Sequence, residues 1–88
     1  MKSFHLIVAT PTGKAYDGKA VQLSLMGECG SLSILADHVP FITNIKAGKC
    51  RIYTETETMN CYSIGGLLSV TKDCVRLITT SFDIENGN

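Results

Sequence analysis

The chain has 88 residues, enough for one small domain. Its apolar fraction of 44% suits a packed core and argues against disorder. Eight basic and eight acidic residues give a net charge of zero, which excludes the basic footprint of a nucleic-acid-binding protein. We therefore expect no nucleic-acid partner.

No apolar run approaches the roughly 20 residues that a membrane-spanning helix requires, so we expect no direct membrane insertion. The N-terminal residues lead directly into an alternating pattern and do not resemble a signal peptide. Without a signal peptide, a reducing compartment and free thiols are expected for the four cysteines. No C-x-x-C spacing occurs, and we predict no metal site. The cysteines are Cys29, Cys50, Cys61 and Cys74.

Alternation of apolar and polar residues with period two is the dominant pattern of the chain. It is clearest in Phe4-His5-Leu6-Ile7-Val8 and in Val21-Gln22-Leu23-Ser24-Leu25. Such alternation is typical of strands with one buried face and one wet face. The predicted strands cover residues 4–9, 21–25, 50–53, 59–64, 67–70 and 75–77. Short strands at this spacing, without a helical stripe, predict an all-β sandwich or barrel.

Turn residues separate these strands. Pro11-Thr12-Gly13 follows the first strand, and Asp17-Gly18 precedes the second as a strong hairpin dipeptide. Ser31 and Ser33 lie in a turn-rich segment. We predict one domain over residues 1–84 and a frayed polar tail over residues 85–88.

One segment comes close to a phosphate-binding loop, because Gly13 to Lys19 reads G-x-x-x-x-G-K. That loop needs Ser or Thr after the Lys and a helix behind it. Here Ala20 follows, and residues 21–25 have the pattern of a strand. We favour two turn glycines in a hairpin connection and predict no cofactor.

Catalytic residues are equally hard to find. Asp37-His38 could suggest acid–base chemistry, but adjacent side chains rarely orient each other and no activated nucleophile accompanies them. We favour a surface or interface role for His38. Gly65-Gly66 within a strand pattern suggests a bulge or a close backbone approach, with a docking point for another backbone as the alternative. The residues alone predict a binding or assembly module without a small-molecule substrate rather than an enzyme.

The order of several segments resembles the β-sandwich domain of the epsilon subunit of F-type ATP synthases. The opening Thr10-Pro11-Thr12-Gly13, the stretch Gly27 to Pro40 and the run Ser63-Ile64-Gly65-Gly66-Leu67 resemble family motifs in the right order over nearly the whole chain. Ser33 and Ala36-Asp37 stand where the family usually has Gly and Pro-Gly. Those positions can require special backbone angles, which Asp tolerates better than Ala.

The resemblance implies a sandwich of two five-stranded sheets in the rotor of the synthase. It implies a non-catalytic subunit that couples ion-driven rotation of the c ring to ATP synthesis through the gamma subunit. The expected location is peripheral, at the cytoplasmic face of the bacterial membrane. The gamma interface is expected at Thr10, His38, Val39, Ile42 and Thr43, and the c-ring interface at Glu28, Cys29, Gly30 and Ser31.

Family members usually continue into a pair of C-terminal helices, which this chain lacks; we therefore expect it neither to inhibit ATP hydrolysis nor to bind ATP. The apolar run Val39-Pro40-Phe41-Ile42 suits a partner contact. Burial is favoured for Phe41, whereas for Ile42 burial and partner contact are equally favoured. The alternatives are a free-standing β-sandwich protein-binding module and, with less support, a small nucleotide hydrolase.

Overall fold

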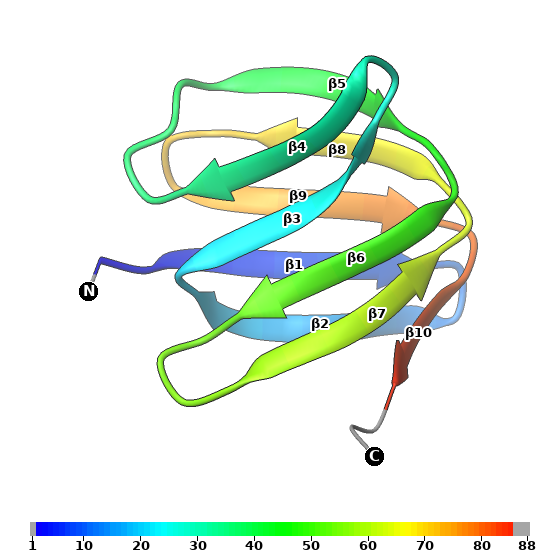
Figure 1. The fold of residues 1–88 in the computed structure, drawn as a ribbon, viewed down its shortest axis with the longest axis horizontal. Coiled ribbons are helices and arrows are strands. Elements are labelled where there is room, and N and C mark those ends of the chain that lie inside the picture. The colour runs from blue at the N-terminus through cyan, green and yellow to red at the C-terminus, as the bar shows by residue number, and fades with distance from the viewer. Residues whose placement is uncertain (1, 86–88) are drawn as a thin grey trace.

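The computed structural model describes residues 2–85, which form ten strands and no helix (Figure 1). The strands are β1 (Phe4–Thr10), β2 (Gly13–Ala20), β3 (Gln22–Gly27), β4 (Gly30–Leu35), β5 (Phe41–Ile45), β6 (Gly48–Tyr53), β7 (Thr58–Ser63), β8 (Gly66–Val70), β9 (Cys74–Thr79) and β10 (Phe82–Glu85). Within this range no helix is long and apolar enough to cross a membrane. The all-β prediction is confirmed.

The strands form two layers of five. The front sheet in Figure 1 has the order β4-β3-β6-β7-β10, and the back sheet has the order β5-β8-β9-β1-β2. Backbone pairing between the layers is confined, among the described residues, to Gly27 of β3 and Ile45 of β5. All strand pairs are antiparallel except β1 with β9. The predicted sandwich of two five-stranded sheets is therefore confirmed.

The core lies between the two sheets and follows the period-two pattern of the sequence. Phe4, Leu6 and Val8 of β1 point inward, whereas His5 between them is exposed. Leu23, Ile52, Leu68, Val75 and Leu77 are completely buried in the same cluster. Burying a side chain of this size stabilises the fold by roughly 1.5–3 kcal/mol, so the alternation decides which face of each strand turns inward.

Three local predictions need correction. Asp17-Gly18 lies inside β2 and not in a turn, because residues 13–20 pair along β1, with a β-bulge at Val8/Ala9. Pairing with β1 therefore overrides the local turn propensity of Asp-Gly. Ser31 and Ser33 lie in β4 rather than in a turn. Glu85 is the last residue of β10, and the remainder of the predicted tail lies outside the described residues.

Gly65 and Gly66 mark a close backbone approach within the chain. A Cβ atom on Gly66 would lie 2.0 Å from the carbonyl oxygen of Ile78, and one on Gly65 would lie 2.9 Å from that of Ile45. Both glycines also have positive φ angles, of 97° and 150°. The interpretation as a close approach is confirmed, and the approaching backbone is the chain's own.

Candidate partner-binding surfaces

The outer face of the back sheet is unusually apolar. The register aligns Leu67 of β8 with Ile78 of β9, and Ile78 with Ala9 of β1, so these side chains form one row across three strands. Leu67 is 38% exposed and Ile78 is 50% exposed. Ile64, just before β8, is exposed beside this row. A contiguous exposed apolar area of this kind usually marks contact with another protein.

A hollow of about 460 Å³ opens at one end of this row, lined by residues 9–11, 64–66 and 78–80. The hydroxyl of Thr79, one of its lining residues, donates a hydrogen bond shared by two carbonyl oxygens, that of Gly65 at 2.5 Å and that of Ser81 at 3.1 Å. On its rim, the Thr10 hydroxyl donates to the carbonyl oxygen of Gly13 at 2.9 Å. Hydrogen bonds from two threonine side chains to backbone carbonyl oxygens therefore lie at this hollow.

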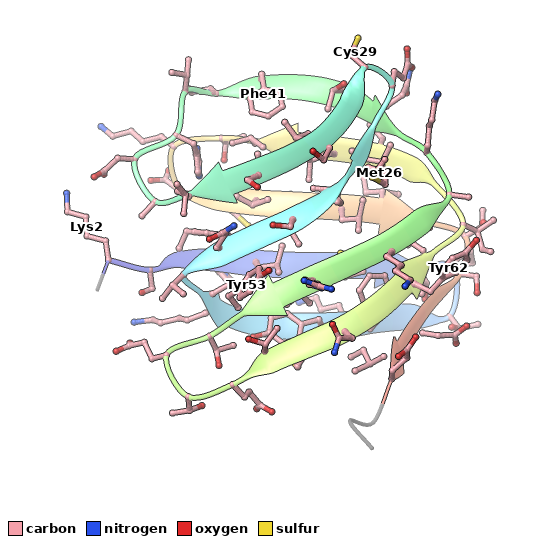
Figure 2. The ribbon with its side chains drawn as sticks, viewed as in Figure 1. Lys2, Met26, Cys29, Phe41, Tyr53 and Tyr62 are labelled. Atoms are coloured by element: carbon pink, nitrogen blue, oxygen red, sulfur yellow. The ribbon has the colours of Figure 1, made fainter. Side chains whose placement is uncertain are left out.

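The outer face of the front sheet carries both polar and apolar side chains. Ser24 and Ser33 face each other across β3 and β4 with their hydroxyl oxygens 3.3 Å apart. The next strand adds Lys49 and Arg51, both exposed. Figure 2 looks onto this face, on which Tyr53 lies. Exposed apolar side chains therefore occur on both outer faces, at Met26, Leu35 and Tyr62 on the front sheet and at Ile42, Leu67 and Ile78 on the back sheet.

His38 and Val39 lie in the connection between β4 and β5, at the end of the sandwich where β1 begins. The His38 ring packs edge-on against Phe4, with ring centroids 5.9 Å apart. Its Nδ1 atom is buried without a hydrogen-bond partner among the described residues. Val39 is 77% exposed. The surface or interface role of His38 stays a prediction.

Asp37, immediately before His38, has a φ of +66° and is the one non-glycine residue in the described range with a positive φ. Its carboxylate accepts a hydrogen bond from the Lys2 ammonium at 2.6 Å. This agrees with the expectation that the position needs a residue tolerant of special backbone angles.

The two predicted interfaces meet in a second hollow. This hollow, of about 390 Å³, is lined by residues 27–32 and by residues 41–43 of β5. Glu28 and Cys29 form the exposed turn between β3 and β4, and Figure 2 shows Cys29 projecting from its tip. Ile42 is 68% exposed and Phe41 is partly buried against the core. Exposure therefore leaves Ile42 free to contact a partner, and the burial favoured for Phe41 is found in part.

The five predicted gamma-interface residues do not form one patch. Thr10 ends β1, whereas His38 packs on Phe4 at its start, and seven strand residues span roughly 20 Å. Thr43 is partly buried, pointing to the opposite side of β5 from Ile42. Leu67 and Ile78 were missed as candidates, although they are the exposed centre of the apolar row.

Charged groups border the apolar row, since Lys14 of β2 pairs with Ala9 and the exposed Arg76 lies two residues before Ile78 on β9. On β1 and β2, the Asp17 carboxylate contacts His5 Nε2 at 2.5 Å and Lys14 Nζ at 3.1 Å. The hydrogen bond from His5, and then that from Lys14, lower the pKa of Asp17 below its ordinary value. These exposed pairs each contribute little to stability. No group of three or more potential metal ligands occurs in the described part of the chain.

The fold is an all-β sandwich that exposes apolar side chains on its outer faces. Residues 3–84 match the family model described as ATP synthase, Delta/Epsilon chain, beta-sandwich domain. The chain belongs to this family.

Curated relatives agree with this membership. The chain is 32% identical over 81 residues to the ATP synthase epsilon chain of Caldanaerobacter subterraneus subsp. tengcongensis, which covers 91% of this chain and 59% of the relative. It is 29% identical over 87 residues to the ATP synthase epsilon chain of Bacillus subtilis, covering 99% of this chain and 66% of the relative. The chain thus spans about three fifths to two thirds of the length of these relatives.

Solved structures share the fold at low sequence identity. A chain of the Euglena gracilis mitochondrial ATP synthase, in an OSCP/F1/c-ring structure, matches 93% of this chain and 53% of its own length, with a TM-score of 0.87 and 14% identity. A chain of the Tetrahymena thermophila mitochondrial ATP synthase central stalk and c ring matches 92% and 66%, with a TM-score of 0.78 and 13% identity.

Proposed function

We propose that the chain is a non-catalytic subunit of the ATP synthase central stalk, which couples ion-driven rotation of the c ring to ATP synthesis through the gamma subunit. The match to the Delta/Epsilon family over residues 3–84 supports this role. The observation that carries it is the apolar row of Ala9, Leu67 and Ile78 on the back sheet, since a domain that transmits torque needs a firm contact with its partner.

The gamma subunit is proposed to cover this row and the hollow at its end. Thr10 lines that hollow, and Ile42 lies on the same outer face at the edge strand β5. Val39 and His38 extend the proposed contact around the β4–β5 connection, and Thr43 lies beside it. Thr79, Gly65 and Gly66 also line this hollow, and their close backbone contacts leave its lining without bulky side chains at these positions.

The c ring is proposed to contact the turn formed by Glu28 and Cys29 together with Gly30 and Ser31, the first two residues of β4. Glu28 is exposed at the tip of this turn, which supports a contact with a polar or basic loop. An exposed ion pair contributes only about 0–1 kcal/mol, so Glu28→Gln should weaken assembly less than tenfold. A bulky residue beside Gly30, such as Ser31→Trp, should weaken it more. Normal assembly of both variants would place the ring contact elsewhere.

The proposed location is peripheral, at the cytoplasmic face of the bacterial membrane, as part of the synthase. The chain would contribute no chemistry of its own. A free-standing protein-binding module that uses the same sandwich is the second candidate, because the apolar row would serve any apolar partner equally well.

Co-purification with a cognate gamma subunit tests the proposal. Ile78→Lys should weaken gamma binding by tenfold or more, because a charge would then face the apolar centre of the contact. Tyr62→Lys on the front sheet is the matched control, since Tyr62 is 43% exposed, close to the 50% of Ile78. If the unaltered chain did not bind gamma, the free-standing module would be favoured. Equal losses in both variants would contradict the assignment of the gamma surface to the back sheet.

A further inference from the structure

On one long side of the sandwich, β4 and β5 are the outermost strands of the front and back sheets (Figure 1). Within residues 2–85, strand β4 pairs only with β3. Strand β5 pairs with β8 along its whole length, but its other edge meets β3 only at Ile45. Each of these strands therefore has an edge without a neighbouring strand.

The register shows which backbone groups of β4 lie on its unpaired edge. The two-residue turn makes Gly27 and Gly30 the first pair of the β3–β4 hairpin, and in an antiparallel pair hydrogen-bonded and non-hydrogen-bonded positions then alternate. Leu32 and Ile34 consequently direct their backbone groups at β3. Ser31 and Ser33 direct their N–H and C=O groups away from β3, toward the unpaired edge.

The composition of these edges differs from that on the opposite side of the sandwich. There, β2 carries Lys14, Asp17 and Lys19, and β10 is only four residues long and carries two carboxylates. None of the six residues of β4 or the five of β5 is charged, and neither strand contains a proline. Charges, prolines and short length are the usual means by which proteins prevent an edge from pairing. The β4 edge has none of the charges or prolines, which is typical of an edge that pairs with something.

The hollow between β4 and β5 is large enough to receive a side chain. The hollow of about 390 Å³ lies against the first half of β4 and of β5. Leu32 and Phe41, both partly buried against the core, contribute its apolar lining. In a strand added to β4, alternate side chains would point toward this hollow and the others toward solvent.

We propose that the β4 edge accepts an extended, uncharged segment of a partner protein as an additional strand, with an apolar side chain of that segment in the hollow between β4 and β5. Backbone hydrogen bonds to Ser31 and Ser33 provide the register, and the hollow selects the side chain. The absence of charge on both edges matches an uncharged segment. The inference does not rest on the proposed stalk function, although the hollow shares residues 27–32 and 41–43 with the proposed c-ring and gamma contacts.

Nuclear magnetic resonance on the whole chain tests it. The probe is a capped peptide matched in length to β4, in which threonine and valine alternate. At millimolar peptide, the amide resonances of Ser31 and Ser33 should shift and their hydrogen exchange should slow. Ser33→Pro removes one outward-facing donor without removing a β3–β4 hydrogen bond, and should weaken binding about tenfold or more. Ser33→Ala keeps that donor and should bind like the unaltered chain.

Other results would overturn the proposal. Unchanged β4 amides at millimolar peptide, or equal shifts at β2 and β10, would show that the β4 edge is not a docking site. Equal binding of a peptide with glutamate in place of threonine would contradict selection of an uncharged segment. If Ser33→Pro failed to fold, Ser31→Pro with Ser31→Ala as its control would repeat the comparison. If both proline variants failed to fold, the shift map of the unaltered chain would decide.

Discussion

Replacing Gly66 with alanine would place a methyl group where the backbone of β9 already lies. The new Cβ would be 2.0 Å from the Ile78 carbonyl oxygen and 3.0 Å from the Thr79 Cα. Neither is the movable end of a side chain, so β8 and β9 must separate locally. Ile45 and Thr79 both pair with Gly66, and the backbone hydrogen bonds at this position would be disturbed.

The expected loss has two parts. A non-glycine residue at a φ of +150° costs about 1–3 kcal/mol in backbone strain. Each disturbed backbone hydrogen bond adds about 1 kcal/mol. Gly66→Ala should therefore destabilise the fold by about 3–5 kcal/mol, a large part of the total expected for a domain of this size. The hollow beside Thr10 should lose its shape at the same time, since Gly66 lines it.

Gly13→Ala is the matched control. Gly13 also has a strongly positive φ, of 133°, but a Cβ atom there meets nothing within 4 Å. This variant should lose about 1–3 kcal/mol from strain alone. Urea denaturation, or thermal unfolding at roughly 4–8 °C per kcal/mol, measures both variants. Equal losses in the two variants would refute the conclusion that close packing of β8 on β9, rather than the φ angle, requires glycine at position 66.

The thiols give two further predictions. Burial first, and then the neighbouring Cys61, raise the pKa of Cys50 to about 12, and burial first, then Glu85, raises that of Cys61 to about 11. At neutral pH a thiol reagent should therefore label the exposed Cys29 fastest and reach Cys50 and Cys61 only when the chain unfolds. Mass spectrometry identifies the labelled cysteines, and rapid labelling of either buried thiol would contradict this prediction. The buried Cys50 thiol also makes the stability of the fold depend on pH. Stability is unaffected below the unfolded pKa of about 9 and falls as the pH rises toward 12, because the unfolded chain loses this proton before the folded one. The loss is about 1.4 kcal/mol at pH 10. The urea midpoint of Cys50→Ala should lack this part of the pH dependence. If the midpoint of the variant fell with pH as steeply as that of the unaltered chain, Cys50 would not be its cause.

Where the sequence predicted the fold well, one face of a strand was buried and the other wet. The pattern of Phe4, Leu6 and Val8 identified β1, and that of Leu23 and Leu25 identified β3, because inward positions alternate with exposed ones. Prediction failed where polar or small residues form edge strands. Strands β2 and β4 pair with neighbouring strands but bury few side chains, so their sequences show little alternation. Local turn signals such as Asp17-Gly18 therefore decided the prediction for β2.

Surface residues were harder to predict for a related reason. Leu67 and Leu68 are adjacent apolar residues, and either could face the core. Pairing of Leu68 with Leu77 buries both, which leaves Leu67 and Ile78 on the outside. The apolar row is thus a consequence of register between strands, and a single sequence does not specify that register. The family resemblance named Thr10 and Ile42 as candidates, but only the folded sheet shows that Leu67 and Ile78 lie together on its outer face.

The apolar row and the β4 edge lie on different sheets, so variants should separate their functions. Ile78→Lys alters the outer face of the back sheet, whereas Ser33→Pro alters the edge of the front sheet. Substitutions without shared contacts usually act independently. Ile78→Lys should therefore reduce gamma binding and leave peptide binding at β4 intact, and Ser33→Pro should do the reverse. The double variant should show the product of the two fold-changes. Loss of both activities in either single variant, with the fold intact, would mean that one partner surface extends around the sandwich from Ile78 across β5 to β4.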